Sequence, residues 1–281
     1  MKKDTTLKSG RRASRSPLSA RNADAHELYQ LAVQSPEIDI GLVSRAFRRE
    51  HGRWPLTLRE DFCGTALLCA EWVRSRAGRR AEGFDIDPEP ARWAMSRHLG
   101  ALRPEARARV RVRRRDVRAS GSFRPDVRVA LNFSYCVFRE RRVLLDYFRR
   151  ARASLATGGL FLIDAHGGPE ASEDLVERRS VDGRFTYVWE QPAFEPFSAH
   201  AIRHITFHFR DGSKLRRPYT YDWRLWTVPE LRDLLDEAGF ARVDVYAEGW
   251  DKDGRNGNGV FRRVTRGENC ASWIVYLAAW R

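Results

Sequence analysis

A short segment combines acidic and small residues where a predicted strand, 56–62, ends and a predicted helix, 66–76, begins. It reads Glu60-Asp61-Phe62-Cys63-Gly64-Thr65-Ala66. A strand–helix loop can bring its backbone close to a ligand only if its residues are small, and the last three residues of the segment satisfy this. The carboxylate of Glu60 can accept hydrogen bonds from an ammonium group or a hydroxyl, or it can pair with Arg59. The segment predicts a loop that binds a nucleotide-like ligand.

A further acid, Asp85, follows about 20 residues after Gly64, at the end of the predicted strand 81–85. It lies in the sequence Gly83-Phe84-Asp85-Ile86-Asp87-Pro88. A carboxylate suits a vicinal diol, because it can accept a hydrogen bond from each hydroxyl. Asp87 is expected to cap the helix that begins at position 88, so Asp85 is available for another role.

Two later strand ends also carry polar residues. The predicted strand 125–133 runs into Asn132-Phe133-Ser134-Tyr135, and the strand 160–165 runs into Asp164-Ala165-His166-Gly167-Gly168. His166 is the best candidate for a general base, which a hydroxyl acceptor would need within hydrogen-bond distance. The structural alternatives are ordinary turn residues in the first segment and a strand-end histidine bonded to its neighbours in the second. The candidates for catalysis are His166, Tyr135 and Asn132.

Strands and helices alternate over much of the chain. Helix 88–99, strand 110–117 and helix 140–155 complete the pattern up to residue 165. Alternation at this spacing predicts a doubly wound α/β fold, with a mostly parallel sheet and helices on both faces. N-terminal helices are expected within 23–55. The domain is expected to span 56–281 and to end in helix 228–238, strand 242–248, a loop to Gly259 and strand 271–279.

The pattern changes after Gly168, where an antiparallel insert is predicted. Its expected strands are 185–189, 201–209 and 215–224, with Asp211-Gly212 as a hairpin turn. We expect residues 181–226 to form a lid over the carboxyl edge of the sheet, where ligands bind in such folds. The aromatic side chains of the insert either shape a pocket or form a small core of the lid itself. The candidate substrate contacts share one strand face and are Tyr219, Tyr221 and Trp223.

Together, these segments resemble the class I S-adenosylmethionine-dependent methyltransferases, with matching spacing over residues 56–168. The nucleotide loop of that family reads acidic-x-Gly-x-Gly-x-Gly, so Glu60 takes the acidic position and Gly64 the middle glycine. Phe62 and Ala66 stand where the family has its first and last glycines. The resemblance implies a seven-stranded sheet of order 3-2-1-4-5-7-6, with strand 271–279 as the antiparallel seventh strand.

The resemblance also assigns roles to individual residues. It implies that Asp85 binds the ribose hydroxyls, that Asp116 binds the adenine amino group, and that Asn132 lies between cofactor and acceptor. Asp116 could alternatively do no more than end a strand. The implied cofactor is S-adenosyl-L-methionine, and the residues expected to bind it are Glu60, Phe62, Cys63, Gly64, Thr65, Asp85, Ile86, Asp116, Val117 and Asn132.

A dinucleotide-dependent oxidoreductase would also have an acid after its second strand. Its loop would cradle a pyrophosphate with the pattern Gly-x-Gly-x-x-Gly. After Gly64 the chain reads Thr65-Ala66-Leu67-Leu68, without a third glycine. Methyl donation needs no pyrophosphate cradle, so the sequence favours the methyltransferase.

Composition limits the remaining classes of protein. The 281 residues are 42% hydrophobic, enough for a substantial core, and no run reaches the roughly 20 apolar residues of a membrane helix. The four cysteines lack CxxC pairs or histidines at metal-site spacing, so we expect reduced thiols of a cytoplasmic protein without a metal site. Residues 1–22 are basic and lack apolar periodicity, and we expect them to be disordered.

The net charge of +14 leaves a nucleic-acid partner open. Arginines alternate with Val110 and Val112 and are expected to occupy one face of a strand. They would either discourage pairing at a sheet edge or bind RNA. The four alternating arginines are Arg107, Arg109, Arg111 and Arg113, and the patch is extended by Arg114, Arg115 and Arg118.

The favoured hypothesis is therefore methyl transfer to an N or O atom of a small molecule, because aromatic inserts of this kind often accompany small acceptors in the family. Two alternatives stay open. The first is an RNA or protein methyltransferase that uses the basic surface. The second is a catalytically silent cofactor-binding protein, which Phe62 and Ala66 suggest.

Overall fold

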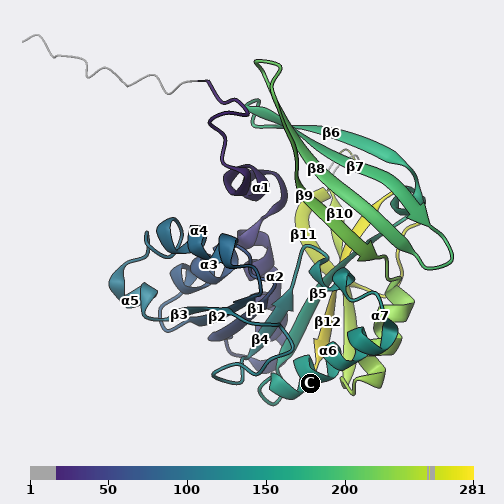
Figure 1. Cartoon of the computed structure of the whole chain (residues 1–281). Helices are drawn as coiled ribbons and strands as arrows, with labels where there is room; N and C mark the ends of the chain where they lie inside the picture. Colours follow the sequence, from purple (N-terminus) through teal and green to yellow (C-terminus); the bar gives the residue numbers. More distant parts are fainter. Residues whose placement is uncertain (1–16, 252, 254–256) are drawn as a thin grey trace, which may run out of the picture.

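The computed structural model describes residues 17–251, 253 and 257–281. Within these ranges an eight-stranded sheet forms the body of the molecule, and a four-stranded sheet stands over one of its edges (Figure 1). The strands of the large sheet are β1 (Thr57–Asp61), β2 (Arg80–Asp85), β3 (Val110–Arg114), β4 (Val127–Ala130), β5 (Leu160–Gly167), β10 (Arg242–Trp250), β11 (Gly257–Val264) and β12 (Trp273–Trp280).

The strand order is that of a doubly wound fold, β3-β2-β1-β4-β5-β12-β10-β11. Strands β1 to β5 run parallel to one another, and β12 lies antiparallel between β5 and β10. These findings confirm the mostly parallel sheet and its inserted antiparallel strand. The predicted count of seven strands is wrong for the described residues, because β11 adds an edge strand to β10. Its first residues, Gly257-Asn258-Gly259, have low strand propensity, which is why the sequence indicated a loop.

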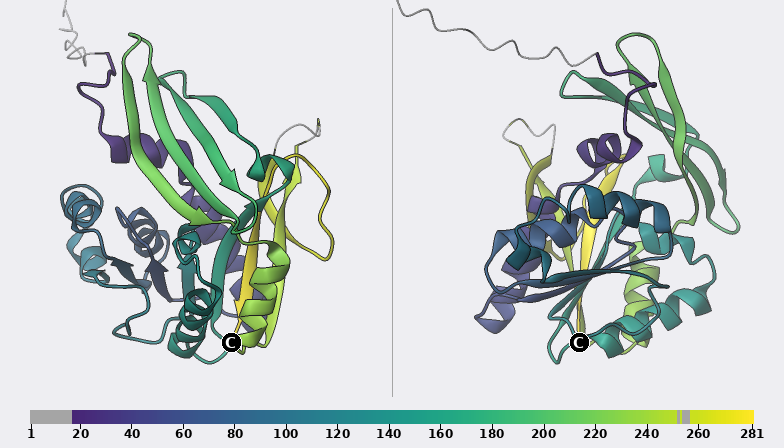
Figure 2. Two further views of the ribbon diagram at one scale, coloured as in Figure 1. Left: turned by 45° about the vertical axis from the view of Figure 1, so that its right-hand side comes forward. Right: turned by 60° about the vertical axis from the view of Figure 1, so that its left-hand side comes forward.

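Helices cover both faces of the large sheet (Figure 2). Helices α2 (Pro36–His51), α3 (Leu67–Ser75) and α4 (Pro88–Ser96) bury apolar side chains in one core cluster, whereas α6 (Arg141–Ser154) and α7 (Val228–Glu237) bury theirs in another. Asp87 caps α4 as predicted, since it accepts from the N–H of Glu89, and Thr227 forms a capping box with Glu230 at the start of α7. The short elements are α5 (Pro104–Arg107), η1 (Ser134–Val137) and η2 (Pro169–Ser172).

The predicted lid is present as an antiparallel sheet of order β6-β7-β8-β9. Its strands are β6 (Leu175–Val181), β7 (Phe185–Glu195), β8 (His200–Phe209) and β9 (Lys214–Arg224). The insert begins at Leu175 rather than at residue 181. Strand β6 is an exposed edge strand whose charged sequence lacks the period of two, so the sequence did not indicate it. The expected turn is confirmed, with Gly212 at a φ of 82° between β8 and β9.

Helix α1 (Ala25–Val33) packs beneath the lid. Its Leu28 and Ala32 share a buried cluster with aromatic side chains of the lid, among them Phe185, Phe207 and Phe209. These three rings therefore form a core, which was one of the two interpretations of the aromatic insert. Figure 1 shows α1 between the lid and the body of the domain, so that this helix connects the two.

The predicted basic tail, residues 1–22, lies mostly outside the described residues. Its described part belongs to the folded body: Leu18 packs against the α1–lid cluster, and the N–H of Ala20 donates to Ser213 Oγ at 2.9 Å. The prediction of disorder is therefore wrong for residues 17–22.

The described ranges contain no helix that is long and apolar enough to cross a membrane. The cysteines are unpaired; Cys63, Cys69 and Cys136 are buried, and Cys270 is partly exposed.

Candidate active site

In the loop that follows β1, every second residue from Phe62 to Ala66 has a left-handed backbone conformation. Phe62, Gly64 and Ala66 have φ values of 55°, 48° and 53°. Left-handed backbone is strained for residues that carry a Cβ, by roughly 1–2 kcal/mol each, and is readily adopted by glycine. The chain therefore keeps a glycine-type loop shape at Phe62 and Ala66 without glycine, because the surrounding strand and helix impose it.

Gly64 and Asp85 join this loop to the end of β2. The N–H of Gly64 donates to Oδ2 of Asp85 at 2.8 Å, and the N–H of Asp87 donates to Oδ1 at 3.0 Å. A Cβ added at Gly64 would meet no atom within 4 Å, so the space beside the loop is open. Next to it, Ile86 exposes 68% of its surface. An open space bordered by a carboxylate and an exposed apolar side chain has the chemistry to hold a nucleoside.

Three other residues of the predicted cofactor set have buried side chains. Glu60 is buried and accepts from the N–H of Cys69 at 3.1 Å, and burial raises the pKa of its carboxyl to about 8. Cys63 is buried against Gly83, since a Cβ at that glycine would lie 2.7 Å from its Sγ. Thr65 Oγ1 accepts from the side chain of Gln30 on α1 at 2.7 Å. Their observed contacts shape the loop.

Asp116 and Val117 follow β3 and show opposite exposure. Asp116 is exposed and forms a two-pronged ion pair with Arg118, with distances of 3.0 Å and 2.7 Å. Hydrogen bonds from Arg118 hold the pKa of the Asp116 carboxyl below its ordinary value. Val117 is buried, and its carbonyl accepts from two buried arginines.

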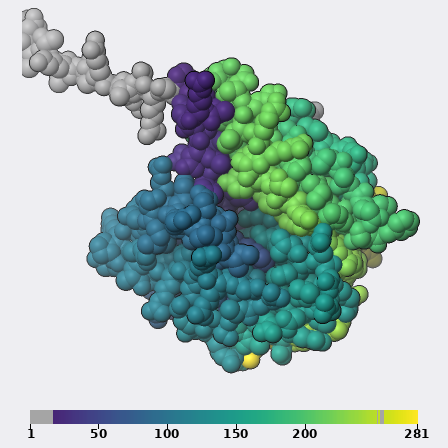
Figure 3. All heavy atoms as spheres, in the orientation of Figure 1, coloured from purple at the N-terminus to yellow at the C-terminus, as the bar shows by residue number. Residues whose placement is uncertain are grey.

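A pocket of about 290 Å³ lies between the carboxyl edge of the large sheet and the inner face of the lid. From the sheet it receives Asn132, Phe133 and His166, and from the lid the aromatic side chains of β7 and β9. Helix α1 closes another side. In the space-filling view, the surface is hollowed where the lid and the body of the domain meet (Figure 3). The aromatic residues lining the pocket are Tyr29, Phe133, Tyr187, Trp189, Tyr221 and Trp223.

His166 is a histidine that lines this pocket. It lies 4.4 Å from the ring of Phe133 and 6.5 Å from that of Trp223, measured between centroids. Its Nε2 is buried and has no hydrogen-bond partner within the described part of the chain. Burial lowers the pKa of His166 to about 4, so the imidazole is neutral near pH 7.

Asp164 fixes the backbone of the loop after β4. Its carboxylate accepts from the N–H groups of Asn132 and Phe133 at 2.7 Å and 2.9 Å. Both residues have a φ of 56°, so these bonds stabilise a strained turn. Burial raises the pKa of Asp164 to about 7. The carboxylate thus positions Asn132 at the pocket.

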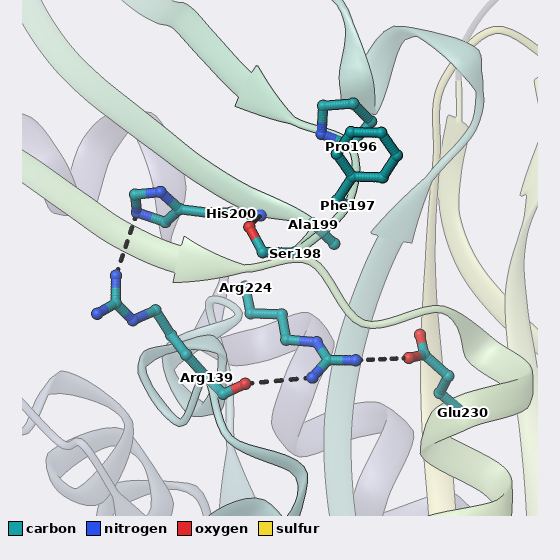
Figure 4. Close-up of a pocket in the computed structure, with 8 residues that line it drawn as sticks. All are labelled: Arg139, Pro196, Phe197, Ser198, Ala199, His200, Arg224 and Glu230. Atoms are coloured by element: carbon teal, nitrogen blue, oxygen red, sulfur yellow. Dashed lines mark hydrogen bonds and ion pairs between the residues drawn. The ribbon is translucent and has the colours of Figure 1, made fainter.

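A larger pocket, of about 520 Å³, opens at the β7–β8 turn (Figure 4). There Arg224 donates to Glu230 and to the carbonyl of Arg139, and Arg139 also pairs with Asp222. None of the predicted site residues lines it. The smaller pocket, which adjoins the carboxyl ends of β4 and β5, is therefore the candidate active site.

Across residues 17–251, 253 and 257–281, no group of three or more His, Cys, Asp or Glu side chains is placed to hold a metal ion.

No protein-family model and no curated protein sequence matches the chain. Solved structures match it over nearly all of its length. A S-adenosylmethionine-dependent methyltransferase from Clostridium acetobutylicum is 15% identical, with a TM-score of 0.65, over 90% of this chain and 96% of that one. CalS10 from Micromonospora echinaspora, an amino pentose methyltransferase, is 16% identical, with a TM-score of 0.62, over 90% and 95%. The sugar N-methyltransferase KedS8 from Streptoalloteichus is 17% identical, with a TM-score of 0.59, over 100% and 98%.

The chain has the class I methyltransferase fold.

In this methyltransferase fold, the predicted residues separate into two groups around the sheet edge. The loop residues, Asp85 and Ile86 border the open space at β1 and β2. Asn132, His166, Tyr221 and Trp223 meet in the pocket at β4, β5 and the lid. Because the carboxyl ends of parallel strands share one edge, both groups face the same side of the sheet.

Two predicted residues do not reach the pocket of the methyltransferase fold. Tyr135 is 1% exposed, and its hydroxyl donates to the carbonyl of Asp164 at 2.8 Å, so it is a core residue and its predicted catalytic role gains no support. Tyr219 points to α1, where its hydroxyl lies 2.9 Å from Nδ1 of His26 and its ring 4.8 Å from that of Tyr29. Of the two tyrosines, only Tyr221 joins Trp223 in the lining of the pocket.

The arginine patch is also corrected. β3 is an edge strand, as one interpretation required, but Arg107 belongs to α5 and Arg109 precedes the strand. Of the four alternating arginines, only Arg111 and Arg113 lie on β3. Arg109 donates to the carbonyl of Arg79, and Arg113 pairs with Glu82, which leaves a smaller basic surface than the alternation indicated.

Sequence reasoning missed the contribution of α1 and β7 to the pocket. Tyr29 and Val33 come from α1, and Trp189 and Gln191 from β7. The apolar spacing of α1 was a signal for a buried helix face, but not for which surface it covers. The aromatic content of β7 pointed to the lid without distinguishing its core from its pocket.

Proposed function

We propose that the protein transfers a methyl group from S-adenosyl-L-methionine to an N or O atom of a small-molecule acceptor. The observation that carries this proposal is the placement of an aromatic pocket containing His166 at the same sheet edge as the Gly64–Asp85 loop. A cofactor held at the loop would adjoin an acceptor held in the pocket. The reaction is an in-line displacement, for which alignment and exclusion of water supply much of the acceleration.

The loop fits this cofactor. The carboxylate of Asp85 keeps lone pairs for ribose hydroxyls while it accepts from Gly64 and Asp87. Ile86 offers an apolar surface to the adenine ring, and the open space at Gly64 admits the nucleoside. When bound, the cofactor supplies an electrophilic methyl group on a positively charged sulfur. Glu60 supports the proposal indirectly, because it fixes the start of α3 beneath the loop.

The acceptor side is suited to a nucleophile that needs little proton abstraction. A histidine with a pKa of about 4 is a weak base, but its neutral ring can accept a hydrogen bond and orient an N–H or O–H group. An amine can attack through its lone pair and release its proton afterwards. The rings of Tyr221 and Trp223 stack at 4.4 Å and offer a flat wall for an apolar or cationic acceptor.

Two comparisons support a small acceptor. CalS10 carries the description amino pentose methyltransferase, and KedS8 that of a sugar N-methyltransferase. We propose an acceptor of similar size, since a pocket of about 290 Å³ under a lid excludes a duplex or a folded protein from its interior. The basic surface near β3 provides no specific observation for RNA as the acceptor.

The test begins with cofactor binding. Thermal unfolding is measured with S-adenosylhomocysteine and, separately, with NAD; at about 100 times its dissociation constant a ligand adds roughly 2.7 kcal/mol, which shifts Tm by several degrees. Transfer of labelled methyl from S-adenosylmethionine is then measured with amino sugars, simple amines, alcohols and RNA. A shift with S-adenosylhomocysteine and turnover on a small amine or alcohol is expected.

Other outcomes would replace the proposal. A shift with NAD alone would indicate an oxidoreductase. Binding of S-adenosylhomocysteine without turnover on any acceptor would indicate the silent cofactor-binding protein that Phe62 and Ala66 suggested. Turnover on RNA alone would move the acceptor site to the basic surface.

A further inference from the structure

A buried cluster of charged side chains lies beneath the loop that follows β3. Arg59 and Asp61 alternate along β1, and Arg128 on β4 is the register partner of Arg59, so all three project from the same face of the sheet. Each of the three is 1% exposed. Buried charges are costly unless they are paired and hydrogen-bonded, so such a cluster requires a full set of partners.

The partners are present. Asp61 accepts from Nε of Arg59 at 2.8 Å, from Nε of Arg128 at 2.6 Å and from the hydroxyl of Tyr147 at 2.7 Å. The guanidinium of Arg59 also lies over the ring of Phe84 on β2, 3.8 Å from its centroid. The carboxylate thereby fixes two guanidinium groups whose remaining N–H donors point away from it.

Three of the remaining hydrogen bonds converge on one stretch of backbone, whereas Nη1 of Arg128 donates to α6, to Ser154 Oγ at 2.7 Å and to the carbonyl of Arg150 at 3.3 Å. The carbonyl of Val117 accepts from Arg59 at 2.5 Å and from Arg128 at 2.7 Å, and the carbonyl of Ala119 accepts from Arg59 at 2.9 Å. Further along the loop, buried Glu82 accepts from both the backbone and the hydroxyl of Ser122, each at 2.9 Å. Side chains from β1, β2 and β4 therefore hold the loop from below.

On its exposed side, the same loop carries Asp116. The resemblance to the methyltransferase family implies that this carboxylate binds the adenine amino group. The side chain of its neighbour Val117 is buried, and the carbonyl of Val117 accepts two hydrogen bonds. The backbone next to Asp116 therefore has little conformational freedom.

We propose that Arg59 and Arg128, oriented by Asp61, are positioning residues that fix the Asp116–Val117 backbone for recognition of the adenine amino group of the cofactor. The inference rests on the proposed function for the identity of the cofactor. It extends that function by assigning nucleobase selectivity to a buried cluster that cannot touch the nucleotide. The two guanidinium groups act through the backbone of the loop.

The experiment compares the affinities of the protein for two ligands. S-adenosylhomocysteine has an exocyclic amino group, and S-inosylhomocysteine has a carbonyl oxygen there, which a carboxylate does not bind. Isothermal titration calorimetry gives both dissociation constants and their ratio. A hydrogen bond to a charged group corresponds to about tenfold or more in affinity, so wild-type protein is expected to prefer the adenosyl ligand by about that factor.

The main variant is Arg128→Met. It replaces one guanidinium side chain with an apolar side chain of similar length. Asp61 stays paired with Arg59 and hydrogen-bonded to Tyr147, so the variant leaves no uncompensated carboxylate. We expect weaker binding of S-adenosylhomocysteine and a ratio of the two constants that falls to about twofold or less. Loss of folded protein alone would lower the number of binding sites without changing this ratio. Where Arg128→Met does not fold, Arg128→Lys keeps the charge but loses the fork that reaches both Asp61 and Val117.

Arg203→Met is the matched control. Arg203 is a fully buried arginine of the lid that also braces backbone carbonyls, those of Ala171 and Ala193, at 2.7 Å and 3.1 Å. This variant is expected to keep the wild-type ratio. Unchanged selectivity in the Arg128 variants, or no preference in the wild type, would overturn the inference while the proposed function stands. Failure of wild-type protein to bind either ligand would reject the proposed function itself.

Discussion

The backbone N–H of Gly64 donates to Oδ2 of Asp85 across 2.8 Å, so the loop of β1 and the acid of β2 form one unit before any ligand arrives. The second oxygen of the same carboxylate accepts from Asp87 at 3.0 Å. The orientation of the carboxylate is therefore set by two backbone groups, which reduces the conformational entropy that ligand binding would otherwise have to remove.

Asp85→Asn is expected to raise the Kd of S-adenosylhomocysteine by about 10- to 100-fold, because hydrogen bonds to a charged group contribute about 1.5–3 kcal/mol. Calorimetric titration at pH 7.5 measures this change. The control is Asp87→Asn, which keeps an N-cap side chain of similar strength on α4 and should leave the Kd within about twofold. Equal effects of the two variants would contradict a ribose role for Asp85.

Tyr221→Ala is expected to raise KM for the acceptor by about 3- to 10-fold, because an aromatic pair contributes about 0.5–1.5 kcal/mol beyond buried area. The Kd of S-adenosylhomocysteine should not change, since Tyr221 belongs to the lid wall of the pocket. Tyr219→Ala, two residues away and directed at His26, is the matched control for loss of a lid tyrosine. A larger effect on KM from Tyr219→Ala would move the acceptor site to the α1 side of the lid.

His166→Gln is expected to lower kcat by about 10- to 100-fold, the lower part of the range for a group that accepts a proton or a hydrogen bond. Because the pKa of His166 is about 4, its titration should not appear in the pH dependence of kcat/KM between pH 6 and 9. His200→Gln, on the larger pocket, should leave kcat unchanged. An inflection near pH 6.5 that disappears in His166→Gln would show that the ring is accessible to protons.

The lowered pKa of His166 also predicts how the free energy of unfolding changes with pH. Its pKa is lower in the folded protein, about 4, than in the unfolded chain, about 6.5, so the unfolded chain binds more protons between these values. The free energy of unfolding of the wild type should therefore fall as pH decreases from about 6.5 to about 4. Urea unfolding of His166→Gln should show a smaller fall over that range.

Glu60 is expected to affect the pH dependence of stability in the direction opposite to that of His166, and Glu60→Gln should remove this effect. The pKa of Glu60 is about 8 in the folded protein, above its ordinary value of 4.5, so the folded state holds a proton that the unfolded chain has released. Stability conferred by the protonated carboxyl is lost as pH rises through this interval. In urea unfolding experiments, the free energy of unfolding of Glu60→Gln relative to that of wild type should increase by about 2–4 kcal/mol from pH 5 to pH 8. Parallel curves would indicate that Glu60 is ionised in the folded protein.

The helices and strands of the doubly wound domain could be predicted where local patterns specify them. Helix caps at Asp87 and Thr227 depend on side chains that bond within one helical turn, and the strands of a parallel sheet appear as short apolar runs separated by helices. The positions of Gly64 and Asp85 at adjacent strand ends follow from that order. Strands β6 and β11 were not predictable, because an edge strand is held by pairing with one neighbour and needs no apolar alternation of its own.

Local sequence patterns were therefore sufficient to predict the doubly wound sheet, the loop and the acids at its strand ends. Which side chains share a pocket depends instead on how distant segments pack. Tyr219 and Tyr221 are both tyrosines on the same face of β9, but Tyr219 contacts His26 of α1 whereas Tyr221 lines the pocket. Likewise, Arg59 and Arg128 meet Asp61 and the carbonyl of Val117 only when β1 and β4 pair. Such contacts depend on the register of distant segments, which no local pattern contains.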